Sequence, residues 1–399
     1  MLEDNPAMSS SKTLQNVPAI VLGSGITLLA TIRCLGRRGV VSLCPCKAAM
    51  TEDRSRWFHP LGAGEPITEK DNLETFLNSI AIQKAVLIPC SDQWTRHVAA
   101  LSPKLRERFP TSLSSLELQD ILTDKGKFRD LLRQHNVPHP NTIFPDKEDD
   151  VETLNDADFK TYFLKPRDSQ SFSHHYGVKG FWQKSREDCK KQLKDVQDAG
   201  FEVVLQEYIP GPPDQHYYVE GFVDRNGVFS ATLGRQRIRM APPDFGNSTY
   251  MRSVALSTLD RAVQSTKKLL TAVKYRGIYS AEFKYDSRDS EFKLIEINAR
   301  PWWYVEFSEL CGINNPYLAY LDALELDVPI IEEYTVGSNC INFLADFSLW
   351  RRYLRAGKIK PWNWIRSWFL AHPTICRLDD PTPGAAWMWQ RVFSAGQSK

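Results

Sequence analysis

The chain has 399 residues, which is enough for two or three domains. Hydrophobic residues make up 42% and charged residues 25%, a composition that excludes a disordered or fibrous protein and is typical of a globular one. Fifty basic residues against 48 acidic ones leave a net charge of +2, so the chain is not expected to bind nucleic acid.

The cysteines and the N-terminal stretch predict the cellular compartment. Eight cysteines are scattered without a CxxC pair, which predicts free thiols in a reducing compartment. Residues 13–32 contain no charged side chain. Pro18 and a glycine turn interrupt this stretch, however, and its apolar part is too short to span a bilayer. We therefore expect a cytoplasmic protein without a signal or membrane segment.

The first part of the chain predicts an open α/β domain. Residues 1–16 are polar and are expected to form a flexible tail. An apolar run at 18–22, a Gly23–Ser24–Gly25 turn, a helical pattern at 26–38 and an apolar run at 40–44 form a β-α-β pattern. With another buried strand at 85–90, the domain is expected to cover residues 17–120.

The Gly23–Ser24–Gly25 turn suits phosphate binding at a helix N-terminus. A dinucleotide fingerprint needs a third glycine where Leu28 stands, and an acidic residue near the end of the second strand, where none is found. An NAD site is therefore not expected, and the turn is interpreted as a tight bend that lines a ligand cleft.

The next 200 residues predict two further lobes, at residues 121–205 and 206–330. Helices are predicted at 124–134, 188–198 and 259–273. Strands are predicted at 162–165, 180–183, 203–208, 217–223 and 228–233, followed by a hairpin of 278–285 and 292–297.

That hairpin carries the most informative polar side chains. Glu296 and Asn298 are two residues apart and so share a face, and Glu282 lies on the partner strand. Both strands are otherwise apolar, and buried carboxylates need a partner such as a cation. Two carboxylates and an amide oxygen suit Mg²⁺, and Arg300 on the same face can hold an anionic oxygen. A surface salt bridge would explain the charges but not their apolar setting.

The order of motifs over residues 18–330 resembles the ATP-grasp superfamily, in particular its ADP-forming carboxylate–amine ligases. Lys125, at a helix start, and Lys165, at a strand end, resemble the lysines that contact nucleotide phosphates, and Lys127 is an alternative to Lys125. The strand that contains Gln206, Glu207, Tyr208 and Ile209 resembles the segment that holds adenine. His216, or Glu220 downstream, resembles the ribose and phosphate contacts.

The resemblance also implies metal ligands and catalytic residues. It assigns Mg²⁺, with Mn²⁺ as a substitute, to Glu282, Glu296 and Asn298, and catalytic roles to Arg300, Arg235 and Lys165. Arg235, Arg237 and Arg239 alternate on one strand, so they form either a solvent face or an anion clamp. The resemblance favours Arg235 on the transferred phosphate.

Two segments differ from a simple member of that superfamily. The flap after the strand lysine, at residues 168–177, has serines and a His174–His175 pair where glycines are usual. The segment 331–399 is expected to form a helical, aromatic C-terminal cap. Its part at 350–369 is rich in Trp and Arg, which is typical of a packed cap with arginines in water, of an interfacial membrane helix or of a nucleic-acid patch; the cap is favoured.

The expected fold is therefore of the α/β and α+β class: an ATP-grasp fold with an N-terminal α/β domain and a C-terminal cap. The resemblance implies that ATP activates a carboxylate as an acylphosphate, that an amine then forms an amide or peptide bond, and that ADP and phosphate are released. Amino-acid-type substrates are expected, and a homo-oligomer stays open. The alternatives are carboxyphosphate chemistry, a non-catalytic nucleotide-binding protein and a membrane-peripheral protein.

Overall fold

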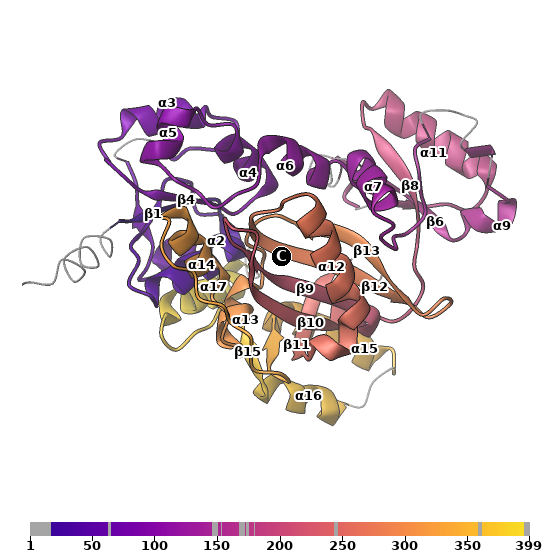
Figure 1. Cartoon of the computed structure of the whole chain (residues 1–399). Coiled ribbons are helices and arrows are strands. Elements are labelled where there is room, and N and C mark those ends of the chain that lie inside the picture. The colour runs from indigo at the N-terminus through magenta and orange to yellow at the C-terminus, as the bar shows by residue number, and fades with distance from the viewer. Residues whose placement is uncertain are drawn as a thin grey trace, which may run out of the picture.

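The computed structural model describes residues 17–62, 65–145, 151–152, 154–166, 172, 175–178, 180–242, 246–357 and 361–394. The tail expected at 1–16 and most of the flap expected at 168–177 lie outside these residues. The described elements form three sheets with surrounding helices (Figure 1).

The N-terminal domain is the predicted open α/β unit. Its four strands are parallel and follow the order β3-β2-β1-β4. The strands predicted at 18–22, 40–44 and 85–90 are confirmed, since each is a nearly continuous apolar run that the sheet buries. The elements are β1 Ala19–Leu22, α2 Gly25–Gly36, β2 Ser42–Cys44, η1 Glu52–Arg54, β3 His59–Pro60, α3 Leu73–Ser79, β4 Val86–Pro89, α4 Asp92–Ala99 and α5 Pro103–Arg108.

A small antiparallel sheet, β5-β8-β6-β7, forms the first of the two predicted lobes. Two helices cover one of its faces, and their apolar residues form a separate core with Leu164 and Leu205. The elements are β5 Thr142–Ile143, α9 Asp156–Phe159, β6 Tyr162–Pro166, β7 Phe181–Trp182, α11 Arg186–Asp198 and β8 Val203–Glu207.

The largest sheet has seven strands in the order β13-β12-β9-β10-β11-β14-β15. The predicted hairpin is confirmed as β12 and β13, and the helix predicted at 259–273 is confirmed as α12. The elements are η2 Pro213–Gln215, β9 His216–Val223, β10 Phe229–Ala241, β11 Asn247–Val254, η3 Leu256–Leu259, α12 Asp260–Ala272, β12 Gly277–Asp286, β13 Glu291–Asn298, α13 Val305–Leu310, α14 Asn315–Ala323, β14 Asn339–Ile341 and β15 Ala371–Pro373.

The boundary before the small sheet differs from the expected one. Helices α6 (Leu116–Thr123) and α7 (Lys125–Gln134) pack with α12 in the core of the large sheet, through residues such as Phe128 and Leu132. Asp124 caps α7, because its Oδ1 accepts from the amides of Gly126 and Lys127. The helix that carries Lys125 therefore belongs structurally to the lobe that follows the small sheet in the chain.

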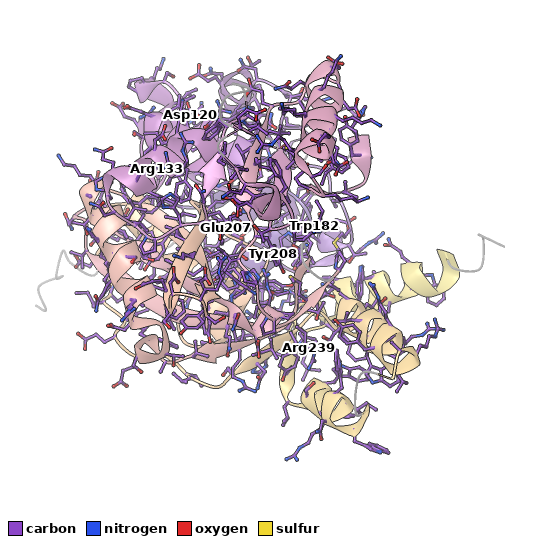
Figure 2. The ribbon with its side chains drawn as sticks, turned by 90° about the vertical axis from the view of Figure 1, so that its right-hand side faces the viewer. Asp120, Arg133, Trp182, Glu207, Tyr208 and Arg239 are labelled. Atoms are coloured by element: carbon purple, nitrogen blue, oxygen red, sulfur yellow. The ribbon has the colours of Figure 1, made fainter. Side chains whose placement is uncertain are left out.

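The C-terminal segment confirms a cap over part of its length. Helices α15 (Phe343–Arg355) and α16 (Pro361–Phe369) lie against the large sheet through buried Asp346. Its carboxylate accepts from Arg239 at 2.8 Å, from Thr249 at 2.7 Å, and from the indole N–H groups of Trp364 and Trp368 at 2.7 and 2.8 Å. Arg239 lies where the C-terminal helices meet the sheet (Figure 2).

The described residues after β15 return to the N-terminal domain. Helix α17 (Pro381–Ser394) follows a turn in which buried Asp380 accepts from Arg33 of α2 at 2.9 Å and from Ser55 at 2.7 Å. All eight cysteines are unpaired, as predicted. Within the described residues, the structure holds no helix of the length and apolarity that crossing a bilayer requires.

Candidate active site

The two faces of the large sheet differ in chemistry. Side chains alternate across β9 and β12, so Val219, Ala281 and Phe283 enter the core beneath α12. The opposite face is polar over the half of the sheet nearest β13. Its side chains are His216, Tyr218, Glu220, Arg235, Arg237, Ser280, Glu282, Lys284, Glu296 and Asn298.

Glu282 and Glu296 lie directly opposite each other on β12 and β13, and Ser280 lies opposite Asn298. The register shifts between Glu282 and Phe283, because Ile295 is an extra residue in β13. Like charges opposite each other destabilise a sheet unless another charge compensates them. The structure thus brings the three predicted metal ligands together on one face, in an arrangement that favours a cation.

The two carboxylates are held differently. Glu282 Oε1 accepts from Arg237 at 3.1 Å and from His216 Nδ1 at 3.1 Å. Burial alone would raise the pKa of Glu282, but Arg237 and His216 outweigh it and hold the pKa of this carboxyl well below its usual range. Glu296 has no hydrogen bond or ion pair among the described residues, although its charge helps to raise the pKa of Arg300.

These residues fit a magnesium ion only in part. No described group of three or more His, Cys, Asp or Glu side chains is arranged to hold a metal by itself. Two carboxylates and the amide oxygen of Asn298 supply hard oxygen donors, and Mg²⁺ in such sites takes its other ligands from water and substrate phosphates. The donor set therefore fits a cation that arrives together with an anionic ligand.

The contact with Glu282 fixes the tautomer of His216. An ionised carboxylate only accepts hydrogen bonds, so Nδ1 carries the proton and Nε2 is left as an acceptor in the neutral ring. Burial lowers the pKa of His216 to about 4, although Glu282 acts in the opposite direction. A neutral imidazole with an acceptor nitrogen suits a hydroxyl donor such as that of a ribose.

We expect His216 to make the folded protein sensitive to acid. Its folded pKa of about 4 lies below the ordinary value of 6.5, so the unfolded chain binds more protons between these pH values. Its contribution to stability is complete above pH 6.5 and falls by about 3 kcal/mol as the pH approaches 4. Urea unfolding should show a flatter pH dependence for His216→Asn than for wild type, and parallel curves would contradict the assignment.

Glu220 and Arg235 are buried together and bind each other. The guanidinium donates to the carboxylate through Nε at 3.0 Å and through a terminal nitrogen at 2.5 Å, and Ser280 donates to the same carboxylate at 2.9 Å. Arg235 also lies over the ring of Tyr218, 3.6 Å from its centroid. In this structure, therefore, both predicted nucleotide contacts are engaged with each other.

The interpretation of Arg235, Arg237 and Arg239 as a solvent face is wrong. Each is mostly or fully buried and has its own carboxylate partner: Glu220, Glu282 and Asp346 respectively. A bulge in the pairing of β10 with β11 separates Arg239 from the other two. Of the three, Arg237 is the one attached to a predicted metal ligand.

Arg300 is held by an acidic residue from the N-terminal domain. Its Nε and a terminal nitrogen donate to the two carboxylate oxygens of Asp92 at 2.7 and 3.0 Å. Asp92 is the first residue of α4, just after Ser91, which caps that helix. The side chain of Asp92 is half exposed, so one partner of this bidentate pair is in contact with solvent.

The two predicted lysines come from different parts of the fold, Lys165 from β6 of the small sheet and Lys125 from the start of α7. Lys125 Nζ donates to the carbonyl of Pro166, the residue directly after Lys165, so two distant segments bring these lysines to the same end of β6. Lys165 and Gln206 lie on the face of the sheet opposite its core, since Leu164 and Leu205 point into that core. Gln206 donates to Thr142 at 3.0 Å.

The predicted adenine segment joins the two lobes. Glu207 accepts from Arg288 in the β12–β13 hairpin at 2.6 Å and from the amide of Asn141 at 3.1 Å. Tyr208 lies beside Trp182, with ring centroids 4.9 Å apart, and Figure 2 shows both near Glu207. The following residue, Ile209, is buried.

Sequence analysis missed four residues of this region: Tyr218, Lys284, Asp92 and the role of Arg237. Lys284 is buried and donates to the carbonyls of Gly211 and Pro212 at 3.0 and 2.7 Å, which fixes the loop after the adenine segment. The signal for Lys284 was present, because it lies two residues after Glu282 and so shares its face. No local pattern indicates Asp92.

In the glycine turn of the N-terminal domain, a side chain of the protein occupies the position where a phosphate was considered. The Glu52 carboxylate accepts from the amide of Gly25 at 2.6 Å and from the amides of Ala49 and Met50 at 2.7 and 2.9 Å. A side chain at Gly23 would collide with Cys90. Gly23 thus serves close packing, whereas Gly25 provides a positive φ of 68° in open space. An internal carboxylate already fills the anion position at the helix start.

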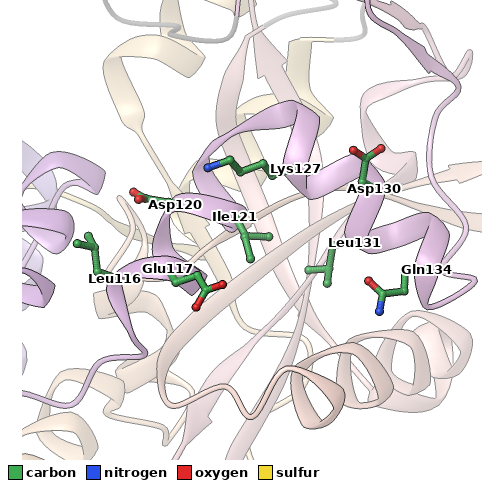
Figure 3. Close-up of a pocket in the computed structure, with 8 residues that line it drawn as sticks. All are labelled: Leu116, Glu117, Asp120, Ile121, Lys127, Asp130, Leu131 and Gln134. Carbon is green, nitrogen blue, oxygen red and sulfur yellow. The ribbon is translucent and has the colours of Figure 1, made fainter.

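A hollow of about 620 Å³ lies between α6 and α7 (Figure 3). Lys127 lines it, together with Leu116, Glu117, Asp120, Ile121, Asp130, Leu131 and Gln134. Lys127 therefore faces a different surface from Lys125, and this hollow is not the predicted nucleotide cleft.

The amino-acid sequence is similar to that of a known ligase. Over 267 residues it is 26% identical to a D-aspartate ligase from Enterococcus faecium strain Aus0004, covering 64% of the chain and 62% of that ligase, so it spans less than two thirds of this relative. No protein-family model matches.

Two solved structures share its architecture. A carboxyaminoimidazole ribonucleotide synthase from Aspergillus clavatus, complexed with ATP, matches with a TM-score of 0.61 at 12% identity over 82% of each chain. A biotin carboxylase from Campylobacter jejuni matches with a TM-score of 0.59 at 14% identity over 82% of this chain and 75% of its own. At such identities the likeness shows the fold.

Proposed function

We propose that this chain, which has the ATP-grasp fold, is an ADP-forming ligase that joins a carboxylate to an amine. The observation that carries the proposal is the Glu282–Glu296 pair, two carboxylates directly opposite each other with Asn298 beside them. A structural salt bridge does not explain Glu296, which has no hydrogen-bonding partner in the described chain. A magnesium ion on a triphosphate explains it, and that cation, when bound, neutralises the triphosphate.

The proposed reaction has two steps. An oxygen of the substrate carboxylate attacks the γ-phosphorus of ATP, which forms an acylphosphate and releases ADP. An amine nitrogen then attacks the acyl carbon, phosphate leaves, and the nitrogen loses a proton to give the amide. Little covalent work falls to the protein, whose side chains align the reactants and stabilise developing charge.

The nucleotide would lie between the polar face of the large sheet and the open face of the small sheet. Lys125 and Lys165 would contact its phosphates, while residues 206–209 would hold the adenine. Nε2 of His216 would accept a hydrogen bond from a ribose hydroxyl, because Nδ1 already donates to Glu282. Arg235 and Glu220 would position the neighbouring side chains of the site and would not contact the nucleotide, since the charge of each is already paired with the other.

Arg300 would bind the reacting anionic group. A substrate carboxylate or phosphate can take the place of Asp92 on the same two N–H groups of the guanidinium. Asp92, once displaced, would offer its carboxylate to an ammonium group nearby. A guanidinium and a carboxylate side by side match the two charged ends of an amino acid, and the similarity to D-aspartate ligase supports the same substrate class.

The test is mass spectrometry of purified protein with MgATP, pooled amino acids and small carboxylic acids. We expect ADP, phosphate and a new product whose mass equals the sum of two components minus water. Formation of AMP would contradict the acylphosphate mechanism, and ADP release that needs only bicarbonate would indicate carboxyphosphate chemistry instead. Glu296→Gln protein prepared in the same way controls for contaminating ATPases.

A further inference from the structure

The C-terminal helices concentrate the exposed apolar side chains of the molecule. Over half of the large hydrophobic residues exposed in the described chain lie between residues 343 and 389. The most exposed of those on α16 are Trp362, at 79%, and Phe369, at 86%, and Leu370 follows at 61%. A cluster of this kind marks an interaction site rather than chance exposure.

Helix α16 has two distinct faces. Trp364 and Trp368, one turn apart, point inward and donate to Asp346. Trp362, Arg366 and Phe369 follow the i, i+4, i+7 spacing on the other side and are exposed. The sequence thus provides one aromatic face that anchors the helix and a second that meets solvent, at the lower edge of the molecule in Figure 1.

The segment that contains α16 and its neighbour α15 is basic. No acidic residue occurs between Asp346 and Asp379. Arg351, Arg352 and Arg355 of α15 line a hollow of about 580 Å³, and none of them forms a salt bridge within the described residues. Guanidinium groups without carboxylate partners complement an anionic surface.

We infer that the outer face of α16 and the arginines of α15 bind the surface of an anionic lipid bilayer. Aromatic side chains insert at the boundary between headgroups and acyl chains, and nearby arginines attract lipid phosphates. The helix has nine residues, about 13 Å in length, so its stripe is too small for a stable dimer interface of about 800 Å² per partner. Exposed Leu370 and a net charge of only +2 favour lipid over nucleic acid.

Vesicle flotation tests the inference with the full chain. We expect the protein to float with vesicles of equal parts phosphatidylcholine and phosphatidylglycerol, and to float poorly with phosphatidylcholine alone. Trp362→Ser/Phe369→Ser should weaken the partition by about a hundredfold, because two large side chains no longer insert. Arg351→Gln/Arg352→Gln/Arg355→Gln should remove the preference for anionic vesicles.

The matched control is Ile330→Ser/Val336→Ser, which removes two comparably exposed apolar side chains outside the C-terminal helices. It should float like wild type, and an equal loss in this control would overturn the inference. The inference would also be overturned if wild-type protein floated with neither type of vesicle. A dimer in light scattering, or binding of single-stranded RNA, that is lost in the Trp362 variant would likewise overturn it. Glu296→Gln protein should float normally, which separates this surface from the proposed catalysis.

Discussion

Glu296→Gln should abolish the proposed ligase activity without lowering stability. The change removes a negative charge that faces Glu282 and has no hydrogen-bonding partner of its own, so unfolding should occur at the same temperature or slightly higher. Activity should fall by about a thousandfold, because the cation loses a charged ligand where the transferred phosphoryl group develops charge. ADP release and differential scanning calorimetry measure the two effects.

Glu282→Gln is the contrasting variant. It also removes the charge of a proposed metal ligand, but it leaves Arg237 buried beside a neutral amide and weakens the hydrogen bond from His216, whose acceptor loses its charge. We expect loss of activity together with destabilisation of about 3 kcal/mol, as for a broken buried ion pair. If Glu296→Gln destabilises as much as Glu282→Gln, or keeps its activity, Glu296 is a structural residue and the metal assignment fails.

The sequence predicted the hairpin well because the information is local. Alternation along an apolar strand places Glu296 and Asn298 on one face, and the structure agrees. The bulge at Ile295 was not predicted, since nothing in the residue pattern distinguishes an extra residue from regular alternation. The position of Glu282 directly opposite Glu296 depends on the register of the two strands, which the structure supplies.

The partners of these residues could not be predicted because they come from distant segments. Asp92 meets Arg300 across 208 positions of sequence, and Arg239 meets Asp346 across 107. The alternating arginines of β10 allowed two interpretations, and only the positions of Glu220, Glu282 and Asp346 decided between them. Charge composition predicts that pairs exist, whereas the fold determines which pairs form.

The C-terminal segment shows the same limit. Its Trp and Arg content correctly predicted a packed cap at α15 and α16, but the return of residues 374–394 to the N-terminal domain was not expected. A network of buried charges connects this returning segment to the N-terminal domain. Arg33, fully buried on α2, contacts Asp380 and also Glu306 of α13 at 3.4 Å.

Asp380→Asn should therefore destabilise the N-terminal domain, although Asp380 lies near the opposite end of the chain. The change leaves Glu306, at 3.4 Å, as the one carboxylate beside the buried Arg33 guanidinium among the described residues, although the carbonyls of Thr374 and Ile375 still accept from it. Breaking a buried ion pair in this way costs about 3 kcal/mol. Hydrogen exchange of the α2 amides measures the effect locally. This measurement does not require a single unfolding transition, which a protein of several domains need not have.

The neighbouring residue supplies the control. Asp379 pairs with Arg37 on the same helix, but its side chain is 45% exposed, and exposed pairs contribute about 1 kcal/mol or less. Asp379→Asn should thus leave α2 exchange nearly unchanged. Equal effects from the two variants would mean that the C-terminal turn stabilises α2 through its backbone alone, whereas a large effect confined to Asp380 means that a carboxylate from the C-terminal segment neutralises the buried arginine of α2.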